Sequence, residues 1–203
     1  MFKKYFILSG IISALLLFLI ATIYYPGGSV YDKNAVGFDW KNNYITNLFG
    51  EKAVNGLDNL ARPWAIAAML VLSVSIGVFF VQFSKKIMVK SASNIIRYFG
   101  VGAMVCAFLT VTPYHDLMVA LAVSMALLSM FYITVFIFKS KLLFFKILSV
   151  ACLLVFYSSN YIYYANTYTV ILPTMQKLTF LMTIIWALGL EYFTDKKDFE
   201  AIK

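Results

Sequence analysis

The sequence predicts an all-α fold, a polytopic bundle of six transmembrane helices with a structured outer loop between the first two. Hydrophobic residues make up 62% of the 203 residues, and the mean hydropathy is +0.83. Charged residues make up only 13%. Apolar runs long enough to cross about 30 Å of hydrocarbon recur along the chain. We expect a single membrane domain over residues 1–203.

Six apolar runs have the length of a membrane span at about 1.5 Å per residue. They lack the polar face of a helix that lies at the surface of a soluble protein. The first run resembles a signal peptide, but no small-residue cleavage motif follows it, so we expect an uncleaved first helix. The expected spans cover residues 5–25, 63–84, 95–113, 116–138, 142–165 and 171–193.

The basic residues predict the orientation, because six spans place both termini on one side. That side carries twelve of the 17 basic residues, namely Lys3, Lys4, Lys85, Lys86, Lys90, Arg97, Lys139, Lys141, Lys146, Lys196, Lys197 and Lys203. The other side carries Lys33, Lys41, Lys52, Arg62 and Lys177. Positively charged loops remain in the cytoplasm, so we expect both termini there.

Several function classes are not expected. The net charge is +8, but the basic residues stand at the ends of apolar runs and form no continuous basic face, so no nucleic-acid partner is expected. Cys106 and Cys152 lie inside apolar runs and have the character of small buried side chains. One histidine cannot supply a three-histidine metal site. Without a P-loop or a GxGxxG motif, we expect no metal and no cofactor.

Aromatic residues concentrate on the predicted outer side, where a ring with an apolar body and a polar tip is stabilised at the membrane–water boundary. We interpret them as an aromatic belt. Its expected members are Tyr24, Tyr25, Tyr31, Trp40, Tyr44, Trp64, Tyr114, Tyr157, Tyr161, Tyr163, Tyr164 and Tyr168.

The connection over residues 26–62 is much longer than a typical loop, and its many apolar residues argue against disorder. Within it, Trp40, Tyr44 and Leu48 recur every four residues. With Asp39 as N-cap, this spacing predicts a short interfacial helix over residues 40–49. We expect this loop to cover the outer mouth of the bundle.

Polar residues from several segments are expected to meet in one pocket at this outer mouth. Lys177 lies about one turn inside the sixth span, so it must reach outward or pair with an acid, for which Asp39 and Asp116 are available. The alternative is a purely structural polar network. The candidate ligand-binding residues are Asp39, Asn43, Asn47, Arg62, His115, Asp116, Asn160, Gln176 and Lys177.

Two functions fit these residues. The first is an integral membrane binding or accessory protein whose partners are membrane lipid, other membrane-protein subunits or further copies of itself. The alternative is an intramembrane lipid hydrolase or transferase. In it, His115 is the general base, Asp116 or Asp39 orients it, and Ser158, Ser159 or water is the nucleophile.

Catalysis is the less favoured hypothesis, because GxSxG and HExxH are absent. Neighbouring residues on a helix also point apart, so we do not expect His115 and Asp116 to pair. A transporter is not indicated either, since no internal repeat and no polar path across the membrane is evident. We expect a binding protein rather than an enzyme.

Three motifs carry a family resemblance: YPGGSVYDKNAVGFDWKNNYITNLFG after the first span, ARPWA opening the second, and PYHDL between the third and fourth. With this layout the chain resembles the bacterial six-span family catalogued as domain of unknown function 998 and, more distantly, DRAM-like eukaryotic membrane proteins. The resemblance implies a multi-pass protein of the bacterial cytoplasmic (inner) membrane with a polar outer loop. It assigns no catalytic residue.

Overall fold

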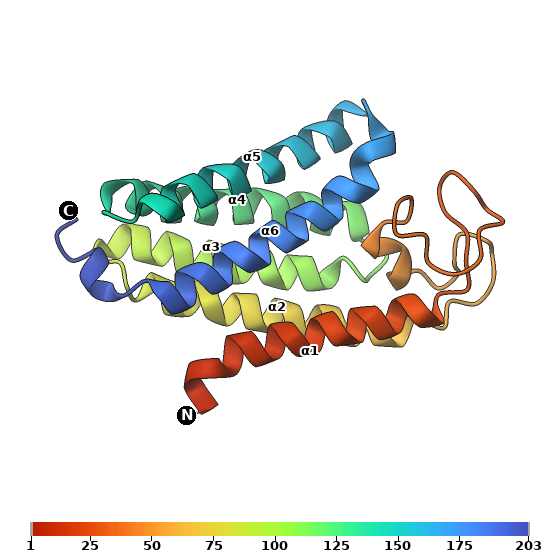
Figure 1. The fold of residues 1–203 in the computed structure, drawn as a ribbon, viewed down its shortest axis with the longest axis horizontal. Coiled ribbons are helices and arrows are strands. Elements are labelled where there is room, and N and C mark those ends of the chain that lie inside the picture. The colour runs from red at the N-terminus through yellow and green to blue at the C-terminus, as the bar shows by residue number, and fades with distance from the viewer. Residues whose placement is uncertain (1, 203) are drawn as a thin grey trace.

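The computed structural model describes residues 2–202, with side chains from Tyr5 to Ile202. Within that range the chain forms six long α-helices and no β-strand (Figure 1), which confirms the expected fold class. Each of the six is long and apolar enough to cross a membrane. The helices are α1 (Phe2–Tyr24), α2 (Arg62–Ser84), α3 (Lys90–Leu109), α4 (His115–Lys139), α5 (Leu143–Ala165) and α6 (Leu172–Phe193).

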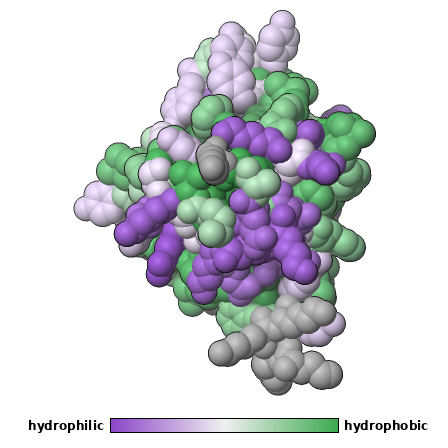
Figure 2. All heavy atoms as spheres, turned by 90° about the vertical axis from the view of Figure 1, so that its left-hand side faces the viewer, coloured by the Kyte–Doolittle hydropathy of each residue, from purple (hydrophilic) through white to green (hydrophobic). Residues whose placement is uncertain are grey.

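The helices run up and down along the length of the molecule (Figure 1). One end carries both termini, and we call it the termini end. The opposite end, which we call the loop end, carries the long connection between α1 and α2. Figure 2 looks onto the termini end, where hydrophilic residues gather among hydrophobic ones.

Helix α2 lies at the centre of the bundle and contacts α1, α3 and α6. It approaches α3 closely at Gly100, where an added Cβ would lie 2.2 Å from the Cγ of Phe80. Small residues at such crossings allow membrane helices to pack tightly. Gly100 therefore sets the distance between α2 and α3.

Trp186 joins three helices in the core and is 1% exposed. Its ring meets Phe79 of α2 edge-on, with the ring centroids 5.7 Å apart. Its indole N–H donates a hydrogen bond of 2.8 Å to the hydroxyl of Ser149 in α5. The polar atom of this large side chain is thus satisfied inside the bundle, as a buried indole requires.

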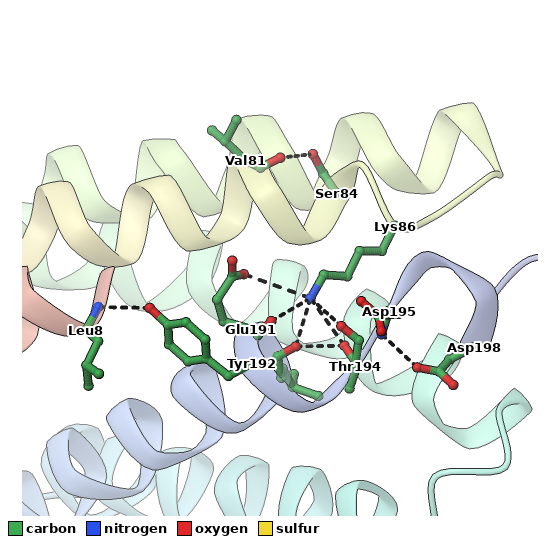
Figure 3. A network of polar contacts seen from close by, with 10 residues as sticks. Leu8, Val81, Ser84, Lys86, Glu191, Tyr192, Thr194, Asp195 and Asp198 are labelled. Atoms are coloured by element: carbon green, nitrogen blue, oxygen red, sulfur yellow. Dashed lines mark hydrogen bonds and ion pairs between the residues drawn. The ribbon is translucent and has the colours of Figure 1, made fainter. Parts of the chain in front are cut away.

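Lys86 closes the termini end by capping the last turn of α6 (Figure 3). Its ammonium donates hydrogen bonds to the carbonyl oxygens of Leu190 (2.9 Å), Glu191 (3.0 Å) and Thr194 (2.9 Å). Carbonyls at a helix C-terminus lack helical partners and carry partial negative charge, so a cation is stabilised there. Burial lowers the pKa of Lys86, whereas the nearby Glu191 carboxylate opposes that shift. The turn between α2 and α3 is thereby fixed to the end of α6.

The third helix differs most from its predicted span of residues 95–113, because it covers Lys90–Leu109. It starts earlier because its polar first turn is accommodated at the termini end, where the Ser93 hydroxyl donates to the carbonyl of Ser84 (2.6 Å). It ends earlier because Thr112 bonds back to the carbonyl of Leu109 (2.7 Å) and Pro113 follows. A residue before proline is biased away from helical backbone angles.

Replacement of Lys86 by methionine tests the cap on α6. We expect Lys86→Met to lower the free energy of unfolding by roughly 2–3 kcal/mol, since hydrogen bonds to a charged group contribute about 1.5–3 kcal/mol. The measurement is unfolding of the purified protein in detergent, followed by circular dichroism. Lys85→Met is the matched control, because Lys85 is exposed. Equal stability of the two variants would contradict the capping role.

Candidate functional site

The connection at the loop end, residues 25–61, is an ordered structure that we call the cap. It contains one short 3-10 helix, η1 (Ile45–Phe49), and a small apolar core in which Tyr25, Leu48 and Phe49 are at most 5% exposed. The ring of Phe49 packs on Phe18 of α1 at a centroid distance of 6.4 Å. The cap therefore rests on the end of the bundle, as the sequence predicted for this loop.

The predicted helix over residues 40–49 is wrong, because only Ile45–Phe49 is helical. The Asp39 carboxylate accepts hydrogen bonds from the amides of Lys41 (2.9 Å) and Asn42 (3.2 Å). The side chain of Asn43 accepts the amide of Asp39 at 2.8 Å. Such local side-chain bonds offer the backbone an alternative to a helix. The segment before Ile45 is consequently a turn.

Three amide side chains hold the cap together, of which Asn43 and Asn59 are buried and Asn47 is half-buried. Asn43 is fully buried and donates to the carbonyl of Gly28 at 2.8 Å, while the side-chain oxygen of Asn47 accepts the amide of Tyr44 at 2.7 Å. Asn59 donates to the carbonyls of Asn47, Leu48 and Gly50 at 2.9–3.2 Å. Because a buried polar group is costly without partners, these amides select one conformation of the cap.

Sequence reasoning did not assign Asn59 this role. Asn59 lies two residues before Ala61, the residue that precedes α2. Its side-chain oxygen does accept the amide of Ala61 (3.2 Å). The contacts of its amide nitrogen depend on how residues 47–50 fold back, and no local pattern reports that.

Two side chains of α6 anchor the cap to the bundle. The Lys177 ammonium donates to the carbonyl of Asn43 (2.5 Å) and to that of Pro173 (2.9 Å). It also lies 6.0 Å from the ring centroid of Phe38, a cation–π geometry. The side-chain oxygen of Gln176 accepts the amide of Ile45 at 2.7 Å. The cap is thus bonded to a helix more than a hundred residues away in sequence.

Lys177 was expected to reach outward or to pair with an acid, and its ammonium reaches backbone carbonyls of the cap and of α6 instead of an acid. Asp39 is close enough to feel its charge. Hydrogen bonding from the side chain of Asn42 chiefly lowers the pKa of Asp39, and the charge of Lys177 lowers it further. One of the three ammonium hydrogens of Lys177 is left for another acceptor.

His115 and Asp116 do pair, contrary to expectation. The Nδ1 atom of His115 lies 3.0 Å from a carboxylate oxygen of Asp116, and the Tyr163 hydroxyl donates to the same oxygen at 3.4 Å. His115 is the first residue of α4, where no preceding helical turn restricts the side chain. The pair joins the start of α4 to the end of α5.

The pair does not reach a serine among the described residues. The hydroxyl of Ser159 is bonded to that of Thr179 at 2.7 Å, and no hydrogen bond is found between His115 and Ser158 or Ser159. The Nε2 atom of His115 is buried without a partner. The geometry provides a base and its orienting carboxylate, but no nucleophile beside them.

The two other predicted site residues make separate contacts. Arg62 forms an ion pair with Glu51 at 3.2 Å, in which the Glu51 side chain is 78% exposed. Asn160 donates to the carbonyl of Phe156 on its own helix at 2.7 Å. The nine candidates therefore divide among a cap–α6 group, the His115–Asp116 pair, an exposed ion pair and an intrahelical bond. The first group contains Asp39, Asn43, Asn47, Gln176 and Lys177.

Aromatic residues cluster at the loop end, as expected. Tyr24 stacks on Trp64 with ring centroids 6.1 Å apart, and both side chains are exposed. Tyr25 differs from the expected belt, because it is 2% exposed and its hydroxyl accepts the amide of Val54 at 3.1 Å. Burial raises the pKa of Tyr25. Tyr25 is a core residue of the cap rather than a boundary residue.

Within the described side chains, no three His, Cys, Asp or Glu residues lie close enough to hold a metal ion. Comparison of the chain with protein-family models, curated proteins and solved structures finds no match. The contacts within this chain are therefore the basis for assigning a function.

Replacement of Lys177 by methionine tests the anchor. We expect Lys177→Met to raise the open fraction of the cap about tenfold, because charge-assisted hydrogen bonds contribute about 1.5–3 kcal/mol. Limited trypsin digestion after Lys41 and Lys52 reports that opening. Lys33→Met is the control, since Lys33 is an exposed cap lysine. Cleavage as slow as in the control would show that Lys177 does not hold the cap.

Lowering the pH tests the contribution of the Asp39 carboxylate to the turn. The pKa of Asp39 is lowered from 3.8, so its contribution to the cap is complete above that pH. The contribution is lost as the pH falls through the lowered value in the folded protein. We expect the protection factors of the Lys41 and Asn42 amides to fall only in that acidic range, and modestly, because water reaches the carboxylate. Asp39→Asn should abolish this dependence; an unchanged acid transition in that variant would assign it to another group.

Proposed function

We propose that this chain is an integral membrane binding or accessory protein of the bacterial cytoplasmic membrane, with the cap as its recognition surface on the outer side. The six apolar helices support a multi-pass membrane protein. The excess of basic residues at the termini end supports an orientation with both termini in the cytoplasm. The partner is a lipid headgroup or another membrane protein reached from the outer side.

The observation that carries this proposal is a cap held by many hydrogen bonds, with exposed apolar side chains. Asn43 beneath the surface is fully buried, whereas Val36 is 96% exposed and Trp40 is 53% exposed. Val30, Tyr31 and Leu57 of the cap are exposed as well. A concentration of exposed apolar groups favours an interaction site, and a surface held in one conformation loses less entropy on binding. The Asp39 carboxylate provides a polar group in the same turn as Trp40.

The hydrolase alternative has less support. The His115–Asp116 pair resembles a base with its orienting carboxylate, but Ser159 is bonded to Thr179. A general base must lie within hydrogen-bond reach of the group it deprotonates. The pair instead joins the start of α4 to Tyr163 in α5, which is consistent with a structural role.

Photo-crosslinking in living cells tests the binding proposal. A photoreactive phenylalanine analogue placed at Val36 should give a discrete lipid or protein adduct, because this position is on the exposed surface of the cap. The same probe at Val105, an exposed residue of α3, is the control for bulk lipid. The adduct should weaken in a Lys177→Met background, where the cap is loosened. Identical adducts at Val36 and Val105 would argue against a recognition surface.

A further inference from the structure

An apolar groove lies at the termini end, between α1 and α5, with α6 as its floor. Its volume is about 890 Å³. Leu8 contributes to one wall, Phe145 and Leu148 to the other, and Leu188, Gly189 and Tyr192 to the floor. In Figure 1, α6 passes between α1 and α5 along this part of the bundle. The groove is distant from the cap, which lies at the other end.

Specific contacts fix each wall of the groove against α6. The Tyr192 hydroxyl accepts the amide of Leu8 at 3.2 Å, and the Tyr192 ring stacks on Tyr5 with centroids 6.4 Å apart. These contacts fix α1 against the floor. On the other side, a Cβ added at Gly189 would lie 2.9 Å from a ring carbon of Phe145. The missing side chain lets α5 settle on α6 without filling the groove.

The length of the groove fits an acyl chain better than a transmembrane helix. Its α6 lining runs from Ile185 to Phe193, which is about 12 Å at 1.5 Å per residue. One leaflet of hydrocarbon is about 15 Å thick, half of the whole core. A partner helix that crosses the membrane would contact a seam along the full length of the bundle. The volume also falls within the range of roughly 300–1,000 Å³ that is usual for small-ligand sites.

Two exposed lysines stand at the termini end, close in sequence to the groove-lining residues of α5 and α6. Lys141 lies in the connection before α5, three residues ahead of Phe144, and Lys196 lies beyond the end of α6, three residues after Phe193. Lys141 and Lys196 are exposed. Basic pockets between helices at the membrane surface attract anionic headgroups. Two acids, Asp195 and Asp198, also lie at this end. Their charges raise the pKa of Lys86, the lysine that caps α6 at the carbonyls of Leu190 and Glu191.

We propose that this groove binds one acyl chain of an anionic phospholipid, whose phosphate is held by lysines at the termini end. The apolar walls accommodate the chain, and the lysines select the headgroup. The site belongs to the leaflet that faces the termini and is independent of recognition by the cap.

Native mass spectrometry of the full-length protein with phosphatidylglycerol or phosphatidylcholine of equal chain length tests the headgroup. Wild type should retain phosphatidylglycerol preferentially. The double variant Lys141→Gln with Lys196→Gln should reduce that preference by about fivefold for each lysine. This is the change in lipid affinity expected from one basic residue near an anionic surface. Lys33→Gln with Lys41→Gln, at the loop end, is the matched control and should leave it unchanged. Equal retention of both lipids by wild type would overturn the proposal, as would equal effects of the two double variants.

A second variant tests whether the groove holds the acyl chain of the lipid. Leu188→Trp should fill the groove and reduce retention of both lipids, whereas Val105→Trp, on an exposed position of α3, should not. Thermal unfolding shows whether Leu188→Trp is folded; if it is not, the exposed lysine pair still decides the proposal. A second copy of the chain retained by wild type and lost with Leu188→Trp, without loss of lipid, would identify the groove as a helix interface and overturn the lipid assignment.

Discussion

A lysine ammonium held by backbone carbonyls is the interaction on which the loop end depends. Lys177 stands inside a membrane-spanning helix, where an unpartnered charge is strongly disfavoured. The carbonyl of Asn43 satisfies it only if the turn at residues 39–43 is formed, and that turn forms only if Asn43 and Asp39 make their side-chain bonds. The anchor, the turn and the buried amides thus require one another, and this mutual dependence makes the long connection a single ordered cap.

The same chemistry recurs at the opposite end of α6. Lys86 donates to carbonyls of the last turn of α6, as Lys177 donates to Pro173 and to the cap near its first turn. Each lysine joins α6 to a segment far away in sequence, the α2–α3 turn in one case and the cap in the other. Helix α6 is therefore fixed at both ends by cations, while Trp186 fixes its middle to α2 and α5. This arrangement keeps the cap and the termini-end groove on one rigid helix.

The fold class and the six spans could be predicted because hydropathy and length are local properties of the chain. The bounds of α3 could not, since its start depends on Ser93 reaching Ser84 and its end on Thr112 bonding back to Leu109. The helix over residues 40–49 was predicted from the spacing of three apolar residues. Local carboxylate and amide bonds outweighed that spacing.

The candidate site, too, could be predicted from the sequence only in part. Grouping Asp39, Asn43, Asn47, Gln176 and Lys177 at one place was possible, because each is a polar residue at the same predicted level of the membrane. Their partners were not predictable, since Lys177 bonds to carbonyls rather than to an acid. Any residue offers a carbonyl, so the sequence contains no signal for which one a lysine meets. The buried role of Asn59 also depends on how the chain folds back.

Hydrogen exchange of the wild-type protein in lipid nanodiscs tests the central claim, a rigid cap, most directly. Backbone amides of Gly28, Asn43 and Ala53 are bonded to the carbonyls of Ala35, Asp39 and Leu57, so we predict that they exchange far more slowly than the amide of the exposed Lys33. Exchange of all four amides at the rate of an unstructured chain would contradict a rigid cap and the recognition surface inferred from it.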